Sequence, residues 1–135
     1  MFDFFTAVSV ETARKLSPVT LAFVGDAVYS LYVREKLVLS ADYPAGTLQK
    51  LTSQQVSAHG QSELIERIFP LFTEEEADVY KRGRNAKKPT KSKNASVAEY
   101  NRSTGLEAVF GYLYLTGQYD RISQLLDSGE EKGKI

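Results

Sequence analysis

The sequence predicts an all-α fold. Its apolar residues recur at helical spacing, and it contains neither a strand-like alternation of apolar and polar residues nor an Asn-Gly hairpin turn. Four prolines and nine glycines separate these periodic segments. A chain of 135 residues, 42% hydrophobic and 25% charged, is typical of one globular domain. We expect that domain at residues 1–128, followed by a disordered tail at residues 129–135.

The first third of the chain predicts a short helix and a long one. The short helix is expected from Thr6 to about Lys15. Ser17 and Pro18 are an N-cap and first-turn pair, and they begin a long helix that runs to about Leu39. This long helix is apolar along two sides, so we expect it to lie inside the fold. The two stripes are Leu21, Val24, Val28 and Leu31, and Val19, Ala22, Tyr29 and Val33.

The middle of the chain predicts three more helices. After the turn at residues 42–46, one helix is expected at residues 47–59, and a second continues to about residue 69, where Pro70 ends it. Thr73 and Glu76 have the spacing of a capping box, in which each side chain accepts a hydrogen bond from the backbone of the other. A third helix is therefore expected to begin at Thr73.

The C-terminal part predicts a basic connection and two helices. The helix that begins at Thr73 runs into the basic segment at residues 81–93. A long helix is expected at residues 95–116, and a last helix closes at about Leu126. The expected core stripe of the long helix is Leu106, Val109, Phe110 and Leu113.

Two carboxylates stand alone on these apolar helices. Asp26 is the one charged residue within residues 19–33, and Glu107 is the one charged residue within residues 103–119. Moving an isolated carboxylate out of water is unfavourable, so each needs a partner or a wet pocket. One interpretation is a structural ion pair with a buried lysine or arginine, although neither window supplies a cation.

The other interpretation is a shared metal ion. Gly25 precedes Asp26, and Gly105 and Gly111 flank Glu107, so another helix, a metal ion or a phosphate could approach closely at both places. If the two helices pack together, both carboxylates converge on a divalent cation. Mg²⁺ prefers oxygen ligands and is usually held by one or two carboxylates together with waters and substrate phosphates. Such an ion polarises a phosphoryl oxygen and activates a bound water.

The basic segment at residues 81–93 holds seven cations and no acidic residue. Its glycine, asparagine and proline predict a helix end and an exposed loop. We expect it to bind a phosphate backbone, which would hold a nucleic acid without reading its sequence. The competing interpretation is a solvated loop balanced by the acids at residues 74–78. The candidate RNA-binding residues are Arg82, Arg84, Asn85, Lys87, Lys88, Lys91 and Lys93, with Lys81 beside them.

Four other residues are weaker candidates. Glu63 and Glu66 have the spacing of a metal-binding pair in some all-α nucleotide pyrophosphatases, but surface charges on a helix explain them better. His59 is expected at a helix end or in a loop rather than as a catalytic base. Tyr114 is expected in the core or in an interface.

Composition excludes several kinds of site. The chain has no cysteine and a single histidine, which excludes disulfides, thiolate metal sites and multi-histidine metal sites. Lys plus Arg and Asp plus Glu both total 17, so only the distribution of charge is informative. Asp3 lies where a secretory signal carries a cation, and no apolar run reaches the roughly 20 residues of a membrane span. We expect a cytoplasmic protein.

Three blocks of the sequence resemble a known family. LAFVGDAVYSLYVREKL at residues 21–37 resembles the signature helix of ribonuclease III, and STGLEAVFGYLYL at residues 103–115 resembles its second acidic helix. With FTEEEADVYKRGRNAK at residues 72–87, they resemble the short branch called Mini-ribonuclease III, which lacks a double-stranded-RNA-binding domain. The resemblance covers residues 17–127.

The resemblance implies an endonuclease domain that forms a homodimer along its signature helices and binds double-stranded RNA in one shared valley. Asp26 falls on the catalytic aspartate of the family and Glu107 on its catalytic glutamate, and both would bind Mg²⁺. A water activated by Mg²⁺ would cleave the phosphodiester and leave 5′-phosphate and 3′-hydroxyl ends. The role implied is maturation of the 23S ribosomal RNA precursor in bacteria, with a ribosomal protein as a candidate partner.

Two positions depart from the longer ribonucleases III. Ala22 and Thr104 stand where those enzymes have acidic residues, which is the pattern of the short branch and removes two candidate metal ligands. Two rival functions remain open from the sequence. One is a non-catalytic RNA-binding or ribosome-assembly module on the same fold, and the other is the nucleotide pyrophosphatase built on Glu63 and Glu66.

Overall fold

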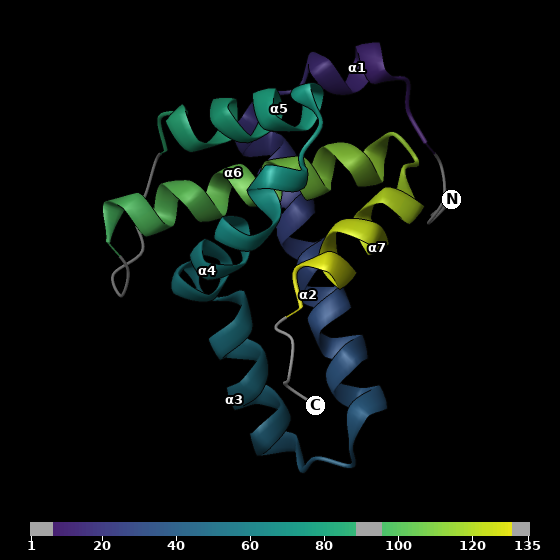
Figure 1. Ribbon diagram of the computed structural model, residues 1–135, viewed down its shortest axis with the longest axis vertical. Coiled ribbons are helices and arrows are strands. Elements are labelled where there is room, and N and C mark those ends of the chain that lie inside the picture. Colours follow the sequence, from purple (N-terminus) through teal and green to yellow (C-terminus); the bar gives the residue numbers. More distant parts are fainter. Residues whose placement is uncertain (1–6, 89–95, 131–135) are drawn as a thin grey trace.

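A computed structural model describes residues 7–88 and 96–130, and within these residues every regular element is helical. The expected all-α fold is therefore confirmed. Figure 1 shows the order and arrangement of the elements. They are α1 (Val10–Arg14), α2 (Pro18–Ser40), α3 (Ala45–Val56), α4 (Ala58–Ile68), the 3-10 turn η1 (Phe69–Leu71), α5 (Glu74–Asn85), α6 (Val97–Leu115) and α7 (Tyr119–Ser128).

Side-chain caps determine where most of these helices begin. Ser17 accepts a hydrogen bond from the backbone N–H of Thr20 at 3.1 Å, with Pro18 in the first turn, as the sequence predicts. The capping box is also confirmed, because Thr73 and Glu76 exchange hydrogen bonds of 3.1 and 2.9 Å. Helix α1 is shorter than expected because Ser9 caps it, so the helix begins at Val10. Thr6 lies outside the described residues.

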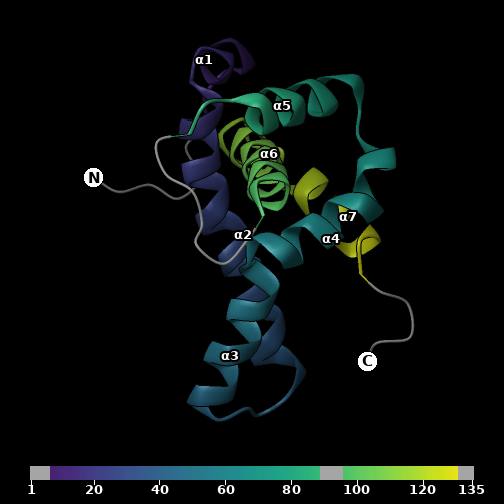
Figure 2. The ribbon, with the colours of Figure 1, turned by 90° about the vertical axis from the view of Figure 1, so that its left-hand side faces the viewer.

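Helix α6 is the centre of the fold. Figure 2 looks along it, with α2, α4, α5 and α7 arranged around it. Its sequence explains this position, since from Ser103 to Leu115 every residue except Glu107 is small, apolar or aromatic, while the polar residues Glu99, Asn101 and Arg102 lie toward its N-terminal end. All four residues of the expected core stripe, Leu106, Val109, Phe110 and Leu113, are at most 1% exposed.

Helices α2 and α6 cross with their backbones in contact. A Cβ atom built on Gly25 would lie 1.7 Å from the carbonyl oxygen of Glu107, and one built on Gly111 would lie 1.9 Å from that of Leu21. Only glycine permits this approach at both positions. The close approach expected around Asp26 and Glu107 is thus present as a helix crossing.

The expectation that α2 lies inside the fold is wrong for part of its surface. Leu21 and Val33 are each 1% exposed, and they face α6 and the body of the domain. Leu31, however, is 64% exposed and Phe23 is 82% exposed. Leu31 ends the expected stripe that begins at the buried Leu21, and Phe23 belongs to neither expected stripe. The described helices therefore leave single apolar residues of α2 at the surface rather than a whole stripe.

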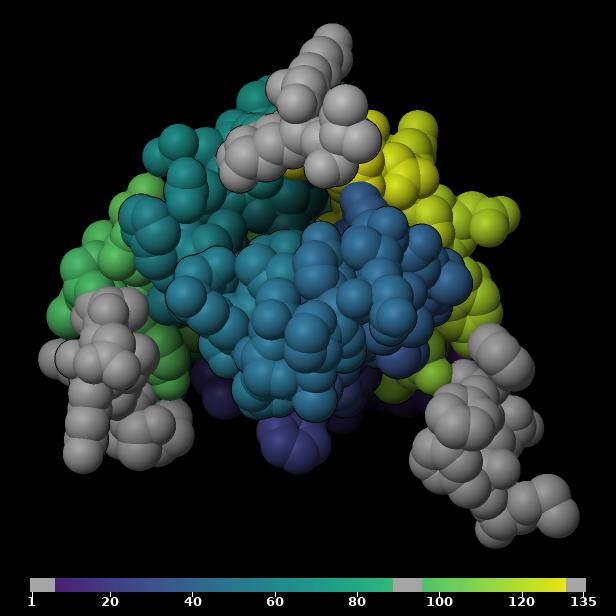
Figure 3. Space-filling view, turned by 90° about the horizontal axis from the view of Figure 1, so that it is seen from below, coloured from purple at the N-terminus to yellow at the C-terminus, as the bar shows by residue number. Residues whose placement is uncertain are grey.

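The C-terminal half of α2 and helix α3 form an arm that projects from the body (Figure 1). Figure 3 views the molecule from the end of this arm, with the turn between the two helices nearest the viewer. Val38 and Leu39 are 61% and 78% exposed there. None of the helices in the described ranges is both long and apolar enough to cross a membrane.

Helix α7 ends at Ser128. The next two residues, which we expected to begin the tail, contact the domain. Arg67 donates a 2.6 Å hydrogen bond to the carbonyl oxygen of Gly129, and Glu130 forms an ion pair with Lys36. Residues 131–135 lie outside the described residues.

Candidate active site

Asp26 and Glu107 lie together where α2 crosses α6. Asp26 directly follows Gly25, and the crossing places Gly25 against the backbone of Glu107. The two carboxyl groups are close enough to share a hydrogen bond. Asp26 is exposed, whereas Glu107 is mostly buried. The helix crossing thus brings together the two acids that the sequence singled out, with one side of the pair open to solvent.

The surroundings of Glu107 favour its neutral form. Burial raises the pKa of Glu107 to about 8, and the charge of Asp26 and its hydrogen bond to Glu107 act in the same direction. A hydrogen bond from Gln61 opposes this rise. Within the described residues, no lysine or arginine contributes to the pKa shift of Glu107, so the structural ion pair considered from the sequence has no support there.

A third residue, Gln61, completes the group, and our sequence analysis missed it. Its side chain is 1% exposed, and its amide nitrogen donates to Glu107 Oε2 at 3.1 Å and to the carbonyl oxygen of Val56 at 3.0 Å. A signal was present, because Gln61 shares one helical face with three buried apolar residues. A glutamine on an otherwise apolar stripe is a candidate for a buried polar contact. The three apolar residues are Leu64, Ile65 and Ile68.

The oxygens of this group fit a divalent cation. Asp26 and Glu107 supply two carboxylates, and the amide oxygen of Gln61 is the one buried side-chain oxygen or nitrogen of the described residues that lacks a hydrogen-bond partner. Oxygen ligands of this kind suit Mg²⁺, which is commonly held by one or two carboxylates. Among residues 7–88 and 96–130, no cluster of three or more histidines, cysteines and acids could hold a metal by itself.

The two positions that depart from the longer ribonucleases III carry no metal ligand. Ala22 is buried on α2, and Thr104 is 6% exposed on α6. The hydroxyl of Thr104 donates to the carbonyl oxygen of Tyr100 at 3.0 Å, so it is used within its own helix. Asp26 is therefore the one acid that α2 brings to this crossing.

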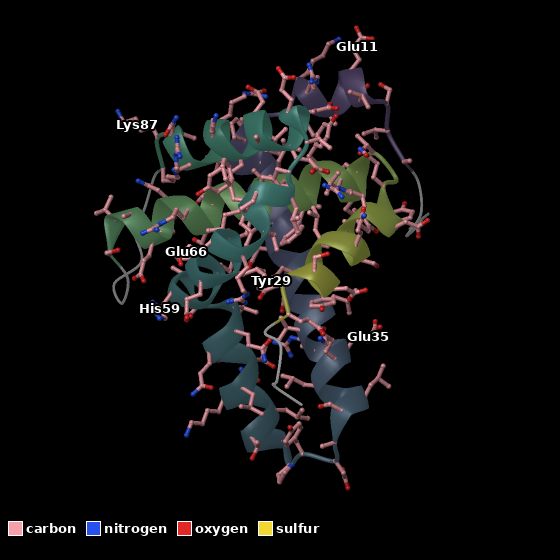
Figure 4. The ribbon with its side chains drawn as sticks, viewed as in Figure 1. Glu11, Tyr29, Glu35, His59, Glu66 and Lys87 are labelled. Carbon is pink, nitrogen blue, oxygen red and sulfur yellow. The ribbon has the colours of Figure 1, made fainter. Side chains whose placement is uncertain are left out.

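The first part of the basic segment continues α5 and reaches α6. Gly83 packs against α6, where an added Cβ would lie 2.9 Å from Gly105 Cα and 3.2 Å from the carbonyl oxygen of Thr104. The crossing thus places the end of α5 beside the part of α6 that carries Glu107. Lys87 lies at the outer end of α5 (Figure 4).

The cations of this segment differ in exposure. Arg82, Asn85 and Lys87 are exposed. Arg84 is half-buried, with its guanidinium 5.6 Å from the ring centre of Tyr80, and the side chain of Lys88 donates to the carbonyl oxygen of Arg84 at 2.8 Å. Lys91 and Lys93 lie outside the described residues.

Two acids of the 74–78 run are paired elsewhere. Glu75 pairs with Arg14 at 3.1 Å, and Glu76 pairs with Arg121 at 2.8 Å. Glu75 also accepts a hydrogen bond from the hydroxyl of the buried Tyr112. These contacts weaken the interpretation in which the acidic run balances the basic segment.

Three of the four weaker candidates lie on the outside of α4, and the fourth, Tyr114, is half-buried on α6 and packs against the core. Glu66 and His59 project from its surface (Figure 4), and Glu63 is exposed as well. His59 contacts Glu99 at 2.5 Å and Glu63 at 3.1 Å, and these two acids raise its pKa. His59 occupies the first turn of the helix, as expected, and Glu63 and Glu66 are surface charges.

Comparison with known proteins agrees with the geometry. Residues 19–118 match the family model described as the ribonuclease III domain. The chain belongs to the ribonuclease III family. Ribonuclease III domains are endonucleases of double-stranded RNA, and members of the family generally depend on a divalent metal. The family assignment gives no support to the pyrophosphatase built on Glu63 and Glu66.

Curated relatives belong to the same family. The chain is 46% identical to the Mini-ribonuclease 3 of Thermoanaerobacter sp. (strain X514), over 87% of this chain and 82% of the relative. It is 43% identical to the Mini-ribonuclease 3 of Staphylococcus aureus, over 84% and 87%. A crystal structure of a Fusobacterium nucleatum protein has a TM-score of 0.78 and 34% identity, and the match covers 84% of this chain and 93% of that one.

Proposed function

We propose that this protein is a homodimeric, Mg²⁺-dependent endoribonuclease that uses Asp26 and Glu107 as its metal-binding and catalytic residues. The observation that carries the proposal is the meeting of these two carboxyl groups at the crossing of α2 and α6. They lie beside a buried amide oxygen that has no hydrogen-bond partner.

The surroundings suit each acid to a different part of the reaction. When bound, Mg²⁺ would polarise a phosphoryl oxygen and lower the pKa of a bound water. Asp26 is exposed and would meet the cation on the side from which RNA arrives. Glu107 is held by Gln61 on the buried side and has a pKa of about 8, so it must release its proton before it can act as an anionic ligand. The reaction would leave 5′-phosphate and 3′-hydroxyl ends.

The basic segment would hold the RNA backbone. Arg82, Asn85 and Lys87 are exposed, whereas the side chain of Lys88 donates a hydrogen bond to the carbonyl oxygen of Arg84. Packing of Gly83 against Gly105 places this end of α5 beside α6, so phosphates bound there would continue toward the two carboxyl groups. Lys91 and Lys93 belong to the same proposed surface.

The exposed side of α2 is proposed as the dimer interface. Phe23 and Leu31 are 82% and 64% exposed, and they lie two helical turns apart on one side of the helix. A second copy packed there would cover this apolar surface and would place Asp26 beside the interface of each protomer. Phe23→Glu is expected to convert a dimer into a folded monomer, as measured by light scattering and circular dichroism. A dimer that persists in Phe23→Glu and in Leu31→Glu would contradict this interface.

The proposed biological substrate is the 23S ribosomal RNA precursor in a bacterial cytoplasm. The support is similarity to proteins named Mini-ribonuclease 3, together with the resemblance of the three sequence blocks to that branch. A ribosomal protein that presents the precursor is included in the proposal. Cleavage of the precursor with and without ribosomal proteins would test that partner.

The catalytic assignment is tested by two nearly isosteric substitutions. Asp26→Asn and Glu107→Gln are each expected to reduce cleavage of a long duplex RNA by about 10³-fold or more, because each removes a charged metal ligand. Glu66→Gln removes an exposed acid of α4 and should cleave like wild type. Cleavage is measured on labelled RNA with and without Mg²⁺. Wild-type rates in either pure variant would contradict the assignment, and RNA binding without any cleavage by wild type would favour the non-catalytic module.

A further inference from the structure

Helix α4 buries a glutamine where its pattern calls for an apolar residue. Gln61 is 1% exposed, while Leu64 and Ile68 on the same face are 5% and 0% exposed. A buried polar side chain is normally retained with all its hydrogen-bonding groups satisfied. Gln61 meets this condition for its nitrogen and not for its oxygen.

The orientation of this amide is determined by its neighbours. Both partners of the amide nitrogen are oxygens, Val56 O at 3.0 Å and Glu107 Oε2 at 3.1 Å. The carbonyl of Val56 cannot donate a hydrogen bond, so the nitrogen and not the oxygen of Gln61 must face it. The amide oxygen is therefore held away from Val56, on the same planar group that contacts Glu107.

The amide that carries this oxygen contacts one member of the carboxyl pair, and no lysine or arginine of the described residues contributes to the pKa shift of that member, Glu107. The side chains of Asp26 and Glu107 share a hydrogen bond, and Gln61 contacts Glu107 directly. A buried acceptor without a hydrogen-bond partner destabilises the fold unless a bound ligand supplies that partner. A cation, or a water bound to one, would satisfy all three groups together.

We propose that Gln61 is a positioning residue of the metal site. Its amide nitrogen fixes the carboxylate of Glu107, and its amide oxygen is the acceptor kept for the cation or for one of its waters. This inference rests on the proposed function, because that proposal assigns the cation to Asp26 and Glu107. A purely structural role is the alternative, in which Gln61 only ties the end of α3 at Val56 to α6.

The two roles predict different responses to Gln61→Met, which keeps the length of the side chain and removes its polar atoms. A positioning role predicts that the Mg²⁺ concentration giving half of the metal-induced rise in unfolding temperature increases about 10- to 100-fold. The half-saturating Mg²⁺ concentration for cleavage should rise by the same factor, and high Mg²⁺ should restore much of the rate. Both titrations use the full chain with Mg²⁺, the first without RNA. Ser62→Ala removes another buried polar group of α4 and should match wild type.

The results separate this inference from the proposed function. If Asp26→Asn weakens Mg²⁺ binding while folded Gln61→Met binds it like wild type, the positioning role is wrong and the proposed site stands. If Asp26→Asn also binds Mg²⁺ like wild type, both are wrong. If Gln61→Met does not fold, Gln61→Asn decides, because it keeps an amide on α4 but shortens the side chain away from Glu107 and the cation, so Mg²⁺ binding should weaken. Wild-type Mg²⁺ binding in that folded variant would refute the inference.

Discussion

Helix α6 is crossed twice at glycines, and the two crossings carry opposite charge. At the crossing with α2, Gly25 and Gly111 bring the carboxyl groups of Asp26 and Glu107 together. At the crossing with α5, Gly83 and Gly105 bring a segment rich in cations against the same helix. The comparison shows how one central helix positions a pair of carboxyl groups and, beside it, a segment rich in cations.

The two crossings also differ in how closely the backbones approach. An added Cβ would lie within 1.7 and 1.9 Å of backbone oxygens at Gly25 and Gly111. At Gly83 the nearest atoms are Gly105 Cα at 2.9 Å and the side chain of Ala108 at 3.0 Å. A side chain added at a glycine is therefore expected to be more destabilising at the crossing of α2 and α6 than at the crossing of α5 and α6.

The largest effect is expected from alanine at the tighter crossing. Gly111→Ala should reduce the free energy of unfolding by more than about 3 kcal/mol, because two backbones must separate. Gly83→Ala should reduce it by about 1–3 kcal/mol, since atoms at 2.9 to 3.2 Å from the added Cβ require a smaller shift of the helices. Gly46→Ala is the control, because nothing lies within 4 Å of an added Cβ there. Urea unfolding measures all three, and equal losses at Gly111 and Gly83 would contradict the distinction.

An intermediate effect is expected when the cations at the second crossing are removed. Replacing Arg82, Arg84 and Lys87 together by alanine should weaken binding of duplex RNA by about 10- to 100-fold and flatten its salt dependence, because fewer phosphate counterions are released. Binding is measured by fluorescence anisotropy at several salt concentrations, with catalysis blocked by Asp26→Asn. A triple variant of Lys15, Lys36 and Lys50 has the same change in charge and serves as the control. An unchanged salt slope would exclude the segment from the RNA-binding surface.

The smallest effect is expected from neutralising the buried acid of the first crossing. The pKa of Glu107 is about 8 in the folded protein, above its usual value of 4.5, so the folded state holds this proton more tightly than the unfolded chain. The metal-free protein should then lose stability as pH rises from about 4.5 to about 8. Glu107→Gln should remove this loss and stabilise the protein by about 1–3 kcal/mol at the upper end.

Denaturant unfolding at several pH values, with and without Mg²⁺, tests that prediction. The advantage of Glu107→Gln should disappear near pH 4, where the carboxyl is neutral in both states, and should shrink when Mg²⁺ is added. Glu66→Gln, at an exposed position of α4, should show no comparable pH dependence. A wild-type stability that increases over this pH range would contradict a buried, proton-holding Glu107.

Local patterns predicted much of the fold. Ser17 with Pro18, and Thr73 with Glu76, mark helix starts that the structure confirms, because capping depends on side chains within three residues of each other. The stripe from Leu106 to Leu113 predicted the buried face of α6 for a similar reason, since the helical repeat alone puts those residues on one side. Patterns of this kind need no knowledge of distant residues.

Other features could not be read from the sequence. Leu21 and Leu31 belong to one expected stripe, yet Leu21 is buried and Leu31 is exposed, because the packing of neighbouring helices decides which part of α2 is covered. The apolar face of α4 marks Gln61 as a buried polar residue, but its partners could not be read from the sequence, since Val56 and Glu107 lie on two other helices.

The sequence by itself determined that the chain is helical, that Asp26 and Glu107 are isolated acids, and that the cations gather in one segment. These properties follow from residue type and from spacing along the chain. Only the tertiary structure decided that the two acids share one crossing, that a buried amide holds one of them, and that the other faces solvent. The physical reason is that electrostatic environment depends on distance and burial, and helix packing sets both between residues far apart in the chain.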